Sequence, residues 1–423
     1  MITSCRSALR SAGWSTIGWS LLVCSVFGLA FGGLPGLAQW SISERQASPE
    51  RTFGVALGDV NGDDRLDAVL AHGVPAGGFP NDVCLNGSAN RLFPACTQLS
   101  SDRLLSSEVA LGDVDGDDDL DAVVANNGET SRGAANQICF NDDGFSADKP
   151  CTDVTAPKAT IDVALGDVDG DGDLDAVFAN SDEGAISGGG AANVVCLNRR
   201  SGDDVDCRAI SSDTQETIGV ALGDVDGDGD LDAVFANRTE HNAVCLNDDG
   251  FASDQPCRKI ASAENGSRGV ALGNVDGDGD LDAVFANGEP NWTNTVCLND
   301  GGFAERQPCD PIGTNNNQSF RVALGDVDDD GDLDAVFANG GFARLPNTVC
   351  HNRDGSFDSD RPCESITPQS RDTRDVALGD LDADGDLDAV FANGGLQFGR
   401  ERVCLNDGRL VGASCQAMGA GNE

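Results

Sequence analysis

The chain has 423 residues, with 71 acidic against 27 basic side chains and a formal net charge of −44 at pH 7. Hydrophobic residues make up 39% of it, which is ordinary for a folded protein, so the acidity does not by itself indicate disorder. Such an acidic chain is poorly suited to nucleic acid, because phosphate recognition needs lysine and arginine clustered on one face. We therefore expect no nucleic-acid partner.

Residues 1–38 are predicted to be a signal peptide. Two arginines precede a long uncharged stretch rich in Leu, Val, Phe and Gly, and Gly36 and Ala38 supply small residues at the −3 and −1 positions for cleavage. The apolar stretch is also long enough to span a membrane, so an uncleaved anchor is the alternative. Pro35 and several glycines weaken a spanning helix and favour cleavage. A membrane contact is expected only for the uncleaved form.

Residues 39–51 are expected to form a lead-in, residues 52–418 a repeat region, and residues 419–423 a tail. An acidic segment recurs in the repeat region, with successive spacings of 54, 54, 57, 50, 52 and 54 residues. The segments start at Asp59, Asp113, Asp167, Asp224, Asn274, Asp326 and Asp380. A period near fifty residues is typical of a propeller or a solenoid rather than of separate domains.

Each repeat has the same internal order. "VALGDV" or a close relative is followed by the acidic turn and "DAVFAN", then by a variable loop, "N-x-V-C-L-N", a turn such as "DDGF" and a segment with a second cysteine. Short apolar runs bounded by turn residues predict strands. Four strands in each of seven repeats predict an all-β fold, a seven-bladed β-propeller of four-stranded blades. The last repeat is expected to supply all four of its own strands, and the alternative is that residues 39–48 add an edge strand.

The fourteen cysteines of the repeat region form seven local pairs, with ten to twelve residues between partners. The pairs are Cys84 with Cys96, Cys139 with Cys151, Cys196 with Cys207, Cys245 with Cys257, Cys297 with Cys309, Cys350 with Cys363, and Cys404 with Cys415. Regular pairs behind an export signal predict one disulfide per blade, joining the third and fourth strands. Zinc ligation is disfavoured, because structural zinc sites use shorter spacings. The expected location is secreted, extracellular or at the cell surface, with the periplasm as an alternative.

Carboxylates occupy positions 1, 3, 5 and 9 of the acidic turns, except that Asn61 stands at position 3 of the first turn and Asn274 at position 1 of the fifth. In the third repeat they are Asp167, Asp169, Asp171 and Asp175, and Gly172 at position 6 permits a left-handed turn. Carboxylates about 5 Å apart repel each other by roughly 3 kcal/mol per pair at an effective dielectric near 20. A chain that repeats this pattern needs a compensating cation. All-oxygen ligands in a flexible loop favour Ca²⁺ over Mg²⁺.

We therefore predict up to seven Ca²⁺ sites, and no other cofactor. The predicted ligands are Asp59, Asn61, Asp63 and Asp67; Asp113, Asp115, Asp117 and Asp121; Asp167, Asp169, Asp171 and Asp175; Asp224, Asp226, Asp228 and Asp232; Asn274, Asp276, Asp278 and Asp282; Asp326, Asp328, Asp330 and Asp334; and Asp380, Asp382, Asp384 and Asp388. The first site is expected to be the weakest, because Arg65 stands where most repeats have Asp. Asp64, Asp118 and Asp329 replace the usual glycines. Position 12 is never Glu, which excludes an EF-hand, and a solvated turn without an ion is the alternative.

The motif "GDVDGDGDLDAVFAN" followed by "N-x-V-C-L-N" resembles the FG-GAP or VCBS repeats of secreted bacterial proteins. The acidic turns are similar to the calcium loops of integrin alpha-chain propellers. The resemblance covers about residues 52–418 and implies a calcium-binding propeller. It does not select an activity, because such propellers serve as adhesion modules, lectins and scaffolds for lyases.

In a propeller, the acidic turns and the third-to-fourth-strand turns share one face, here called the acidic face. The second-to-third-strand loops and the links between blades share the opposite face, and they vary in length and content, so we call it the variable face. It is predicted to bind an unidentified protein or a glycan, because recognition belongs on variable loops. The polar residues assigned to it are Arg132, Arg238, Arg268, Arg321, Arg344, Arg371, Arg374, Arg400, Arg402, His72, His241 and Trp292. The alternative is that these arginines only offset the acidity and stay solvated.

The predicted function is adhesion or surface recognition by a monomeric, secreted, calcium-binding propeller. The alternative is a carbohydrate-binding or polysaccharide-modifying protein. A lectin with one site per blade is disfavoured, because the chain lacks tyrosine and Trp292 is its only tryptophan beyond Trp40. No enzyme is expected: His72, His241 and His351 lie in different repeats without a nucleophile motif. His351 takes the place of a Leu or Phe and is expected to be structural.

Overall fold

The computed structural model describes residues 51–73, 79–87, 92–128, 133–142, 144–181, 190–199, 205–212, 214–248, 250–251, 257–260, 266–289, 292–314, 318–341, 345–357, 362–366, 372–394 and 400–418. The chain divides into two units, Met1–Gln46 and Ala47–Glu423, and every described residue belongs to the second. The predicted signal peptide, the predicted tail and the lead-in before Arg51 lie outside the described residues. In the described part, no helix is long and apolar enough to cross a membrane.

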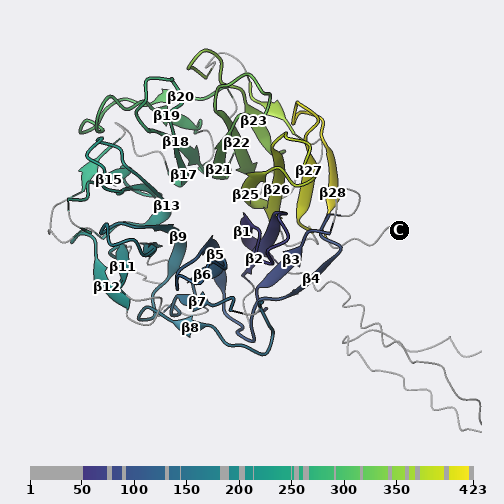
Figure 1. The fold of residues 1–423 in the computed structure, drawn as a ribbon. Helices are drawn as coiled ribbons and strands as arrows, with labels where there is room; N and C mark the ends of the chain where they lie inside the picture. The colour runs from purple at the N-terminus through teal and green to yellow at the C-terminus, as the bar shows by residue number, and fades with distance from the viewer. Residues whose placement is uncertain are drawn as a thin grey trace, which may run out of the picture. The chain divides into compact units, whose positions relative to one another are not determined.

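The second unit is a ring of seven four-stranded antiparallel sheets, which confirms the predicted seven-bladed propeller (Figure 1). The first, innermost strands are β1 (Thr52–Gly58), β5 (Ser106–Gly112), β9 (Thr160–Gly166), β13 (Thr217–Gly223), β17 (Ser267–Gly273), β21 (Ser319–Gly325) and β25 (Thr373–Gly379). The second strands are β2 (Asp67–His72), β6 (Asp121–Asn126), β10 (Asp175–Asn180), β14 (Asp232–Asn237), β18 (Asp282–Asn287), β22 (Asp334–Asn339) and β26 (Asp388–Asn393).

The two outer strands of each blade are shorter. The third strands are β3 (Asp82–Leu85), β7 (Gln137–Cys139), β11 (Val194–Asn198), β15 (Ala243–Cys245), β19 (Thr295–Cys297), β23 (Thr348–Cys350) and β27 (Arg402–Leu405). The fourth are β4 (Ala95–Gln98), β8 (Thr152–Asp153), β12 (Val205–Ala209), β16 (Arg258–Lys259), β20 (Asp310–Pro311), β24 (Glu364–Ser365) and β28 (Ser414–Ala417). Blades 1 to 7 are numbered in this order.

The blades pack face to face because both surfaces of each sheet are apolar. All six residues of every second strand are buried, as expected for a strand covered on both sides. The glycine that ends each first strand makes room for a leucine of the next blade. A Cβ atom added at Gly166 would lie 2.6 Å from Leu231 Cδ1, so a larger residue does not fit there.

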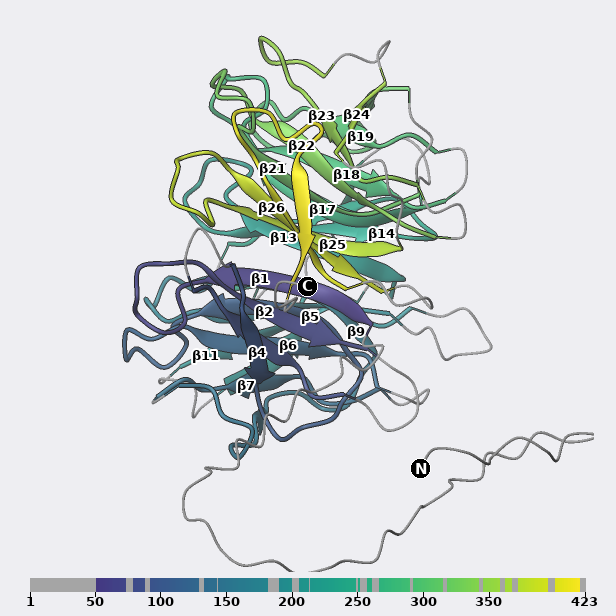
Figure 2. The ribbon, with the colours of Figure 1, turned by 90° about the vertical axis from the view of Figure 1, so that its right-hand side faces the viewer.

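Blade 7 closes the ring against blade 1 with its own four strands, as predicted (Figure 2). The innermost strands β25 and β1 lie side by side, and the Val55 amide donates a hydrogen bond to Asp375 Oδ2 at 2.8 Å. Ring closure therefore uses the same packing as the other blade contacts.

All seven predicted disulfides are present, one in each blade. In blade 3, Cys196 pairs directly with Cys207 across β11 and β12. The bonds join the third strand to the fourth strand or to the residue just before it. By the chain-entropy model, closing loops of this length stabilises the fold by roughly 3 kcal/mol each.

Candidate metal centres

The acidic turn of blade 3 joins β9 to β10 and is held by hydrogen bonds to its own carboxylates. The Gly172 amide donates to Asp167 Oδ2 at 3.0 Å, and the Asp173 amide donates to Asp171 Oδ1 at 3.0 Å. Gly170 and Gly172, at positions 4 and 6, have φ angles of +74° and +99°. The turn between β9 and β10 is short and contains two left-handed residues, so its aspartate side chains converge.

Four turns place a residue other than glycine at these left-handed positions. Asp64, Asp118, Asp329 and Ala383 have φ angles of 64°, 73°, 58° and 65°. A left-handed conformation costs an L-residue roughly 1–2 kcal/mol. The turn geometry is therefore maintained even where the sequence does not favour it.

In three blades the structure brings together predicted ligands from positions 1, 3 and 9 of the acidic turn. In blades 2, 3 and 4, carboxylate oxygens from positions 1, 3 and 9 lie within 4.8 Å of one another. The groups are Asp113, Asp115 and Asp121; Asp167, Asp169 and Asp175; and Asp224, Asp226 and Asp232. In blade 2, a second group joins positions 3 and 5 to Asp142. Sequence analysis missed Asp142, although the repeated "DDGF" turn placed an acidic residue on the same face.

The position-9 aspartates are buried, and in six blades burial raises the pKa of this carboxyl group, namely that of Asp67, Asp121, Asp175, Asp232, Asp282 and Asp388. Burial raises the pKa of Asp175 to about 6, while amide hydrogen bonds from Asn198 and Val168 partly offset that rise. Burial, and then the neighbouring Asp171 charge, also raises the pKa of Asp169. A divalent cation at this point would reverse both effects by favouring the ionised carboxylates.

Buried oxygens without a partner test whether a cation fits. At position 3, one carboxylate oxygen is buried and has no hydrogen-bond partner among the described residues in five turns, those of Asp115, Asp169, Asp226, Asp328 and Asp382. An unsatisfied buried polar group costs about 1–3 kcal/mol, and more if it is charged. A hard cation held by carboxylate oxygens would supply the missing partner, so the residues fit Ca²⁺.

The turn of blade 1 carries its own positive charge. Arg65 Nη2 lies 2.6 Å from Asp63 Oδ2. The Asn61 side-chain amide donates to Asp67 Oδ2 at 3.0 Å and so occupies one oxygen of the position-9 carboxylate. These contacts give a physical reason for the prediction that this site is the weakest.

A ring of asparagines, which we call the asparagine belt, connects the acidic turns to one another. In blade 3, the Asn198 amide donates to Asp175 Oδ1 at 2.7 Å, and the Asn198 side chain donates to the Val114 carbonyl of blade 2 at 2.6 Å. Every blade repeats this arrangement. The belt consists of Asn86, Asn141, Asn198, Asn247, Asn299, Asn352 and Asn406. Each position-9 aspartate is thus tied to the preceding blade.

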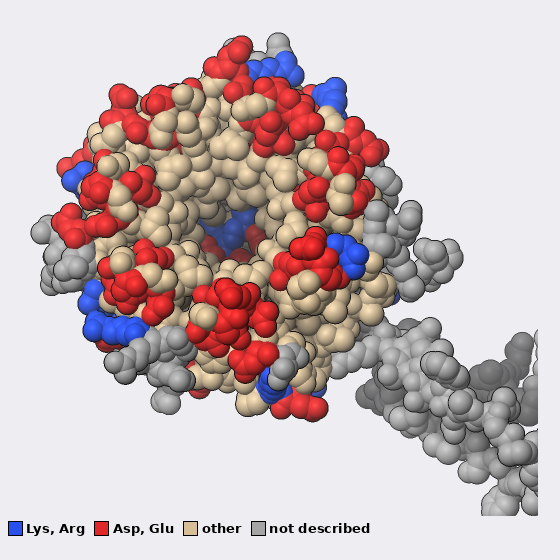
Figure 3. Space-filling model, viewed as in Figure 1, with Lys and Arg blue, Asp and Glu red and all other residues tan. Residues whose placement is uncertain are grey.

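Seen from the acidic face, the acidic side chains gather in clusters around a central opening (Figure 3). The clusters lie over the blades, and basic side-chain atoms are visible deep in the opening. The acidity is therefore concentrated at the turns rather than spread evenly over this face.

A different carboxylate cluster, the channel cluster, lies at the third residue of the innermost strands. It consists of Glu108, Asp162, Arg321 and Asp375. Arg321 Nη2 lies 3.3 Å from oxygens of both Glu108 and Asp162. Its Nη1 donates to the Ile218 and Arg268 carbonyls at 3.0 and 2.6 Å. Placing Arg321 among the recognition residues of the variable face was therefore wrong.

Burial controls ionisation in the channel cluster. It raises the pKa of Asp375 to about 6 and the pKa of Glu108 well above its ordinary value, and the Arg321 charge opposes both rises. The pKa of Asp162 is also raised by burial, against the effect of Arg321. Three buried carboxyl groups share one guanidinium.

Among the other residues assigned to the variable face, two arginines alternate with phenylalanines at the second residue of the innermost strands. Arg374 lies over the rings of Phe320 and Phe53, at 4.1 and 5.7 Å from their centroids, and Arg268 lies 4.7 Å from that of Phe320. The side chains of Arg268 and Arg374 remain 21% and 26% exposed. We call Phe53, Arg268, Phe320 and Arg374 the arginine–phenylalanine ladder.

The remaining assigned residues differ in availability. Arg238 pairs with Glu216 at 3.1 Å, and Arg402 Nη1 donates to the Cys415 carbonyl at 3.0 Å. His72 is buried, with its Nδ1 3.2 Å from Thr52 Oγ1. Arg400 is exposed, and His241 and Trp292 are half-buried. Arg132, Arg344 and Arg371 lie outside the described residues.

Residues 224–285 and 274–337 match the family described as FG-GAP-like repeat. No curated protein matches the sequence. Similar solved structures include BBS1N in complex with ARL6DN, soaked with lead, at 13% identity and a TM-score of 0.49, covering 81% of this chain and 90% of that chain. The mercury-soaked complex has 12% identity and a TM-score of 0.49, with 82% and 93% covered. The V. cholerae biofilm matrix protein Bap1 has 11% identity and a TM-score of 0.43, with 86% and 80% covered.

Proposed function

We propose that this propeller, which carries FG-GAP-like repeats, is a secreted, non-catalytic recognition module that is stabilised by Ca²⁺ and binds an anionic partner on its variable face. The observation that carries the proposal is the difference between the two faces. One face repeats the same acidic turn in every blade, whereas the loops of the other differ from blade to blade. Repetition suits a structural task, and variation suits recognition.

Calcium suits the acidic face for two reasons. The predicted ligands are oxygens, and five turns hold a buried carboxylate oxygen that has no hydrogen-bond partner within the described ranges. Extracellular modules of this type bind Ca²⁺ with dissociation constants of about 10⁻⁴–10⁻³ M. The seven disulfides support the same location, because disulfides persist in oxidising compartments.

The arginine–phenylalanine ladder is where we expect an anionic partner to bind. Arg268 and Arg374 are partly exposed, and both guanidinium groups lie over the Phe320 ring. Each also lies beside a carboxylate, that of Glu289 at 3.6 Å and that of Asp372 at 2.8 Å, so an anionic partner would share the guanidinium groups with these two residues. Guanidinium groups held in this way can form paired hydrogen bonds to a carboxylate or a sulfate. An acidic polysaccharide or an acidic protein surface offers such groups, and the ring provides a rigid platform for them.

The test is a binding screen of untagged protein starting at residue 39. Acidic polysaccharides and cell-envelope fractions are screened in Ca²⁺ and in chelator. Changing Arg268 and Arg374 together to Gln should weaken binding of any ligand found by at least about tenfold, since charged hydrogen bonds contribute about 1.5–3 kcal/mol each.

The matched control removes two arginines outside the ladder. Arg199 and Arg409 lie in the turns between the third and fourth strands, on the acidic face, and their side chains are 50% and 61% exposed. Changing both to Gln alters the net charge equally and should leave binding unchanged. Equal loss in the two double variants would mean nonspecific charge attraction, and no ligand under any condition would favour a purely structural surface protein.

A further inference from the structure

Blade 6 differs from the other blades beside its acidic turn. The residue after the third-strand cysteine is apolar in the other six blades and is His351 in blade 6. The apolar residues are Leu85, Phe140, Leu197, Leu246, Leu298 and Leu405. A leucine at this position has no polar atom to satisfy, whereas an imidazole brings two nitrogen atoms that need partners.

His351 directs one ring nitrogen into the acidic turn. Its Nδ1 atom lies 3.2 Å from Asp328 Oδ2 and 3.2 Å from Asp334 Oδ2. The side chain of His351 is 6% exposed, and that of Asp334 is fully buried. The expectation of a purely structural histidine did not foresee this contact, because sequence position does not show where the ring points.

The site is built around unsatisfied buried atoms. Asp328 Oδ1 and His351 Nε2 are both buried and have no hydrogen-bond partner in the part of the chain that the structure describes. The Asn352 amide donates to Asp334 Oδ1 at 2.8 Å, which fixes the carboxylate facing the histidine. One imidazole nitrogen and two carboxylate oxygens thus lie within 4.8 Å of one another in a rigid setting.

We infer that the sixth acidic turn is a transition-metal site, which binds Zn²⁺ through His351 Nδ1, Asp328 and Asp334. Ca²⁺ takes oxygen ligands, whereas imidazole suits Zn²⁺, Cu²⁺ and Ni²⁺. Ligand atoms about 2.1 Å from a tetrahedral zinc lie roughly 3.4 Å apart. The distances of 3.2 Å from His351 Nδ1 to the Asp328 and Asp334 oxygens are close to this value. The inference goes beyond the proposed function, because it does not require that the other turns bind calcium.

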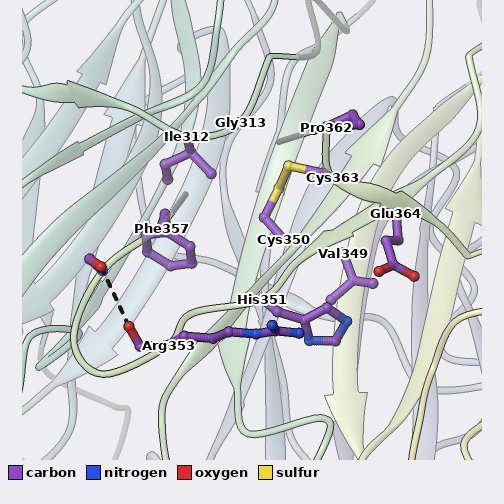
Figure 4. Close-up of a pocket in the computed structure, with 11 residues that line it drawn as sticks. Ile312, Gly313, Val349, Cys350, His351, Arg353, Phe357, Pro362, Cys363 and Glu364 are labelled. Carbon is purple, nitrogen blue, oxygen red and sulfur yellow. Dashed lines mark hydrogen bonds between the residues drawn. A yellow bond between two sulfur atoms is a disulfide. The ribbon is translucent and has the colours of Figure 1, made fainter. Parts of the chain in front are cut away.

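A pocket reaches the histidine of this site, but neither Asp328 nor Asp334 lines it. His351 lines a pocket of about 470 Å³, together with Arg353 and Glu364 of blade 6 and Ile312 of blade 5. In Figure 4 the Arg353 side chain extends toward the His351 ring, with Glu364 beyond the ring. A metal site needs such access as well as ligands. The three donors also leave at least one tetrahedral position open for water.

The rival explanation uses the same distances. A protonated imidazole could donate to both carboxylates and act as a built-in cation in place of a metal. That arrangement would neutralise the turn and exclude a divalent ion, whereas a zinc site needs the neutral ring as a ligand. Metal binding therefore separates the two explanations.

The experiment measures metal binding by the untagged full-length repeat region in millimolar Ca²⁺. We expect one Zn²⁺ per chain that excess Ca²⁺ does not displace, and one Co²⁺ whose visible spectrum shows nitrogen coordination. His351→Leu installs the residue of other blades and should weaken Zn²⁺ binding by at least about 100-fold, more than the loss of an outer-shell contact. The control His241→Asn, in another blade, should leave it unchanged.

A gain-of-site variant protects the test against a folding defect in His351→Leu. Leu246→His places an imidazole beside the turn of Asp226 and Asp232 in blade 4 and should add a second tight Zn²⁺ site. Failure of the wild type to retain Zn²⁺ in Ca²⁺, or equal retention by His351→Leu, would overturn the inference. Thermal stability in Ca²⁺ and in chelator is measured in parallel, so a failed zinc site is distinguishable from failed calcium binding.

Discussion

The acidic turns and the channel cluster both bring carboxylates together, but they differ in where the opposing charge comes from. In the channel, Arg321 of blade 6 reaches Glu108 and Asp162 of blades 2 and 3. In the turn of blade 3, buried oxygens of Asp167 and Asp169 have no hydrogen-bond partner among the residues that the structure describes. A high density of aspartate therefore does not identify an ion site by itself. The distinguishing observation is whether the chain supplies the cation.

Removing calcium should have the largest effect, because it acts on every turn that lacks an internal cation. A ligand at ten times its dissociation constant stabilises the native state by about 1.4 kcal/mol per site, so several sites together contribute on the order of 5–10 kcal/mol. Thermal unfolding followed by circular dichroism should show a sharply lower Tm in chelator than in Ca²⁺. The Tm should recover on adding Ca²⁺ but much less on adding Mg²⁺. An equal Tm in chelator would mean that the turns need no ion.

The second prediction removes the internal cation of the channel. Arg321→Met leaves Glu108, Asp162 and Asp375 buried without an opposing charge, and breaking a buried pair in this way costs about 3–5 kcal/mol. Denaturant unfolding in saturating Ca²⁺ should show the loss, since calcium at the turns cannot replace the arginine.

A compensated variant provides the control for that prediction. Adding Glu108→Gln and Asp162→Asn to Arg321→Met removes two of the stranded charges, so part of the lost stability should return. If the single substitution leaves the free energy of unfolding unchanged, the channel carboxyls are already protonated at neutral pH and need no cation.

Most of the fold could be predicted because the same sequence pattern recurs in every blade. The period, the apolar runs and the cysteine pairs each occur seven times, so an accidental match in one copy carries little weight. The acidic turn could be predicted for the same reason, since its spacing alone places positions 1, 3 and 9 near one another.

The sequence could not predict features that depend on where a side chain points or on which blade it contacts. Arg321 follows a variable loop in the sequence, but it lies on the innermost strand and its side chain enters the channel. The position of His351 was identified as unusual, yet only the structure shows that its ring faces the acidic turn. The asparagines of the belt recur in every repeat of the sequence. The sequence does not show that the Asn198 side chain donates to a carbonyl group in another blade, 84 residues away.

The third prediction concerns the pH dependence of stability that the channel cluster contributes. The folded pKa of Asp375 is raised to about 6, so between about pH 4 and 6 the folded state holds a proton that the unfolded state has lost. This group therefore adds stability below pH 4, and that stability is lost as the pH rises through 6. The loss is on the order of 2–3 kcal/mol.

Asp375→Asn isolates this contribution, because the amide oxygen can still accept the hydrogen bond from the Val55 amide. Unfolding free energies of wild type and variant are compared across the pH range in chelator, where turn carboxylates titrate equally in both proteins. As the pH rises through 6, the free energy of unfolding of the wild type should fall relative to that of the variant. Glu108 and Asp162 face the same space, so parallel pH profiles would mean that the proton resides on one of them.

The smallest effect is expected from a substitution that removes the arginine beside an acidic turn and leaves Ca²⁺ as the turn's only source of positive charge. Arg65→Asp removes the contact with Asp63 and gives blade 1 the residue that blade 3 has at the same position, Asp173. Without Ca²⁺ the change should destabilise the protein by less than about 1 kcal/mol, because the pair is exposed. With Ca²⁺ the first turn should bind more tightly, and a tenfold gain corresponds to about 1.4 kcal/mol.

The reciprocal variant Asp173→Arg makes this comparison symmetric. It gives the third turn an internal cation, so its calcium affinity should fall while the stability in chelator changes little. Calcium titrations of Tm for both variants and the wild type measure the two shifts. Opposite shifts would show that an arginine beside the turn substitutes for part of the ion's charge. Shifts in the same direction would mean that position 7 acts through turn geometry instead, and that the weakness of the first site has another cause.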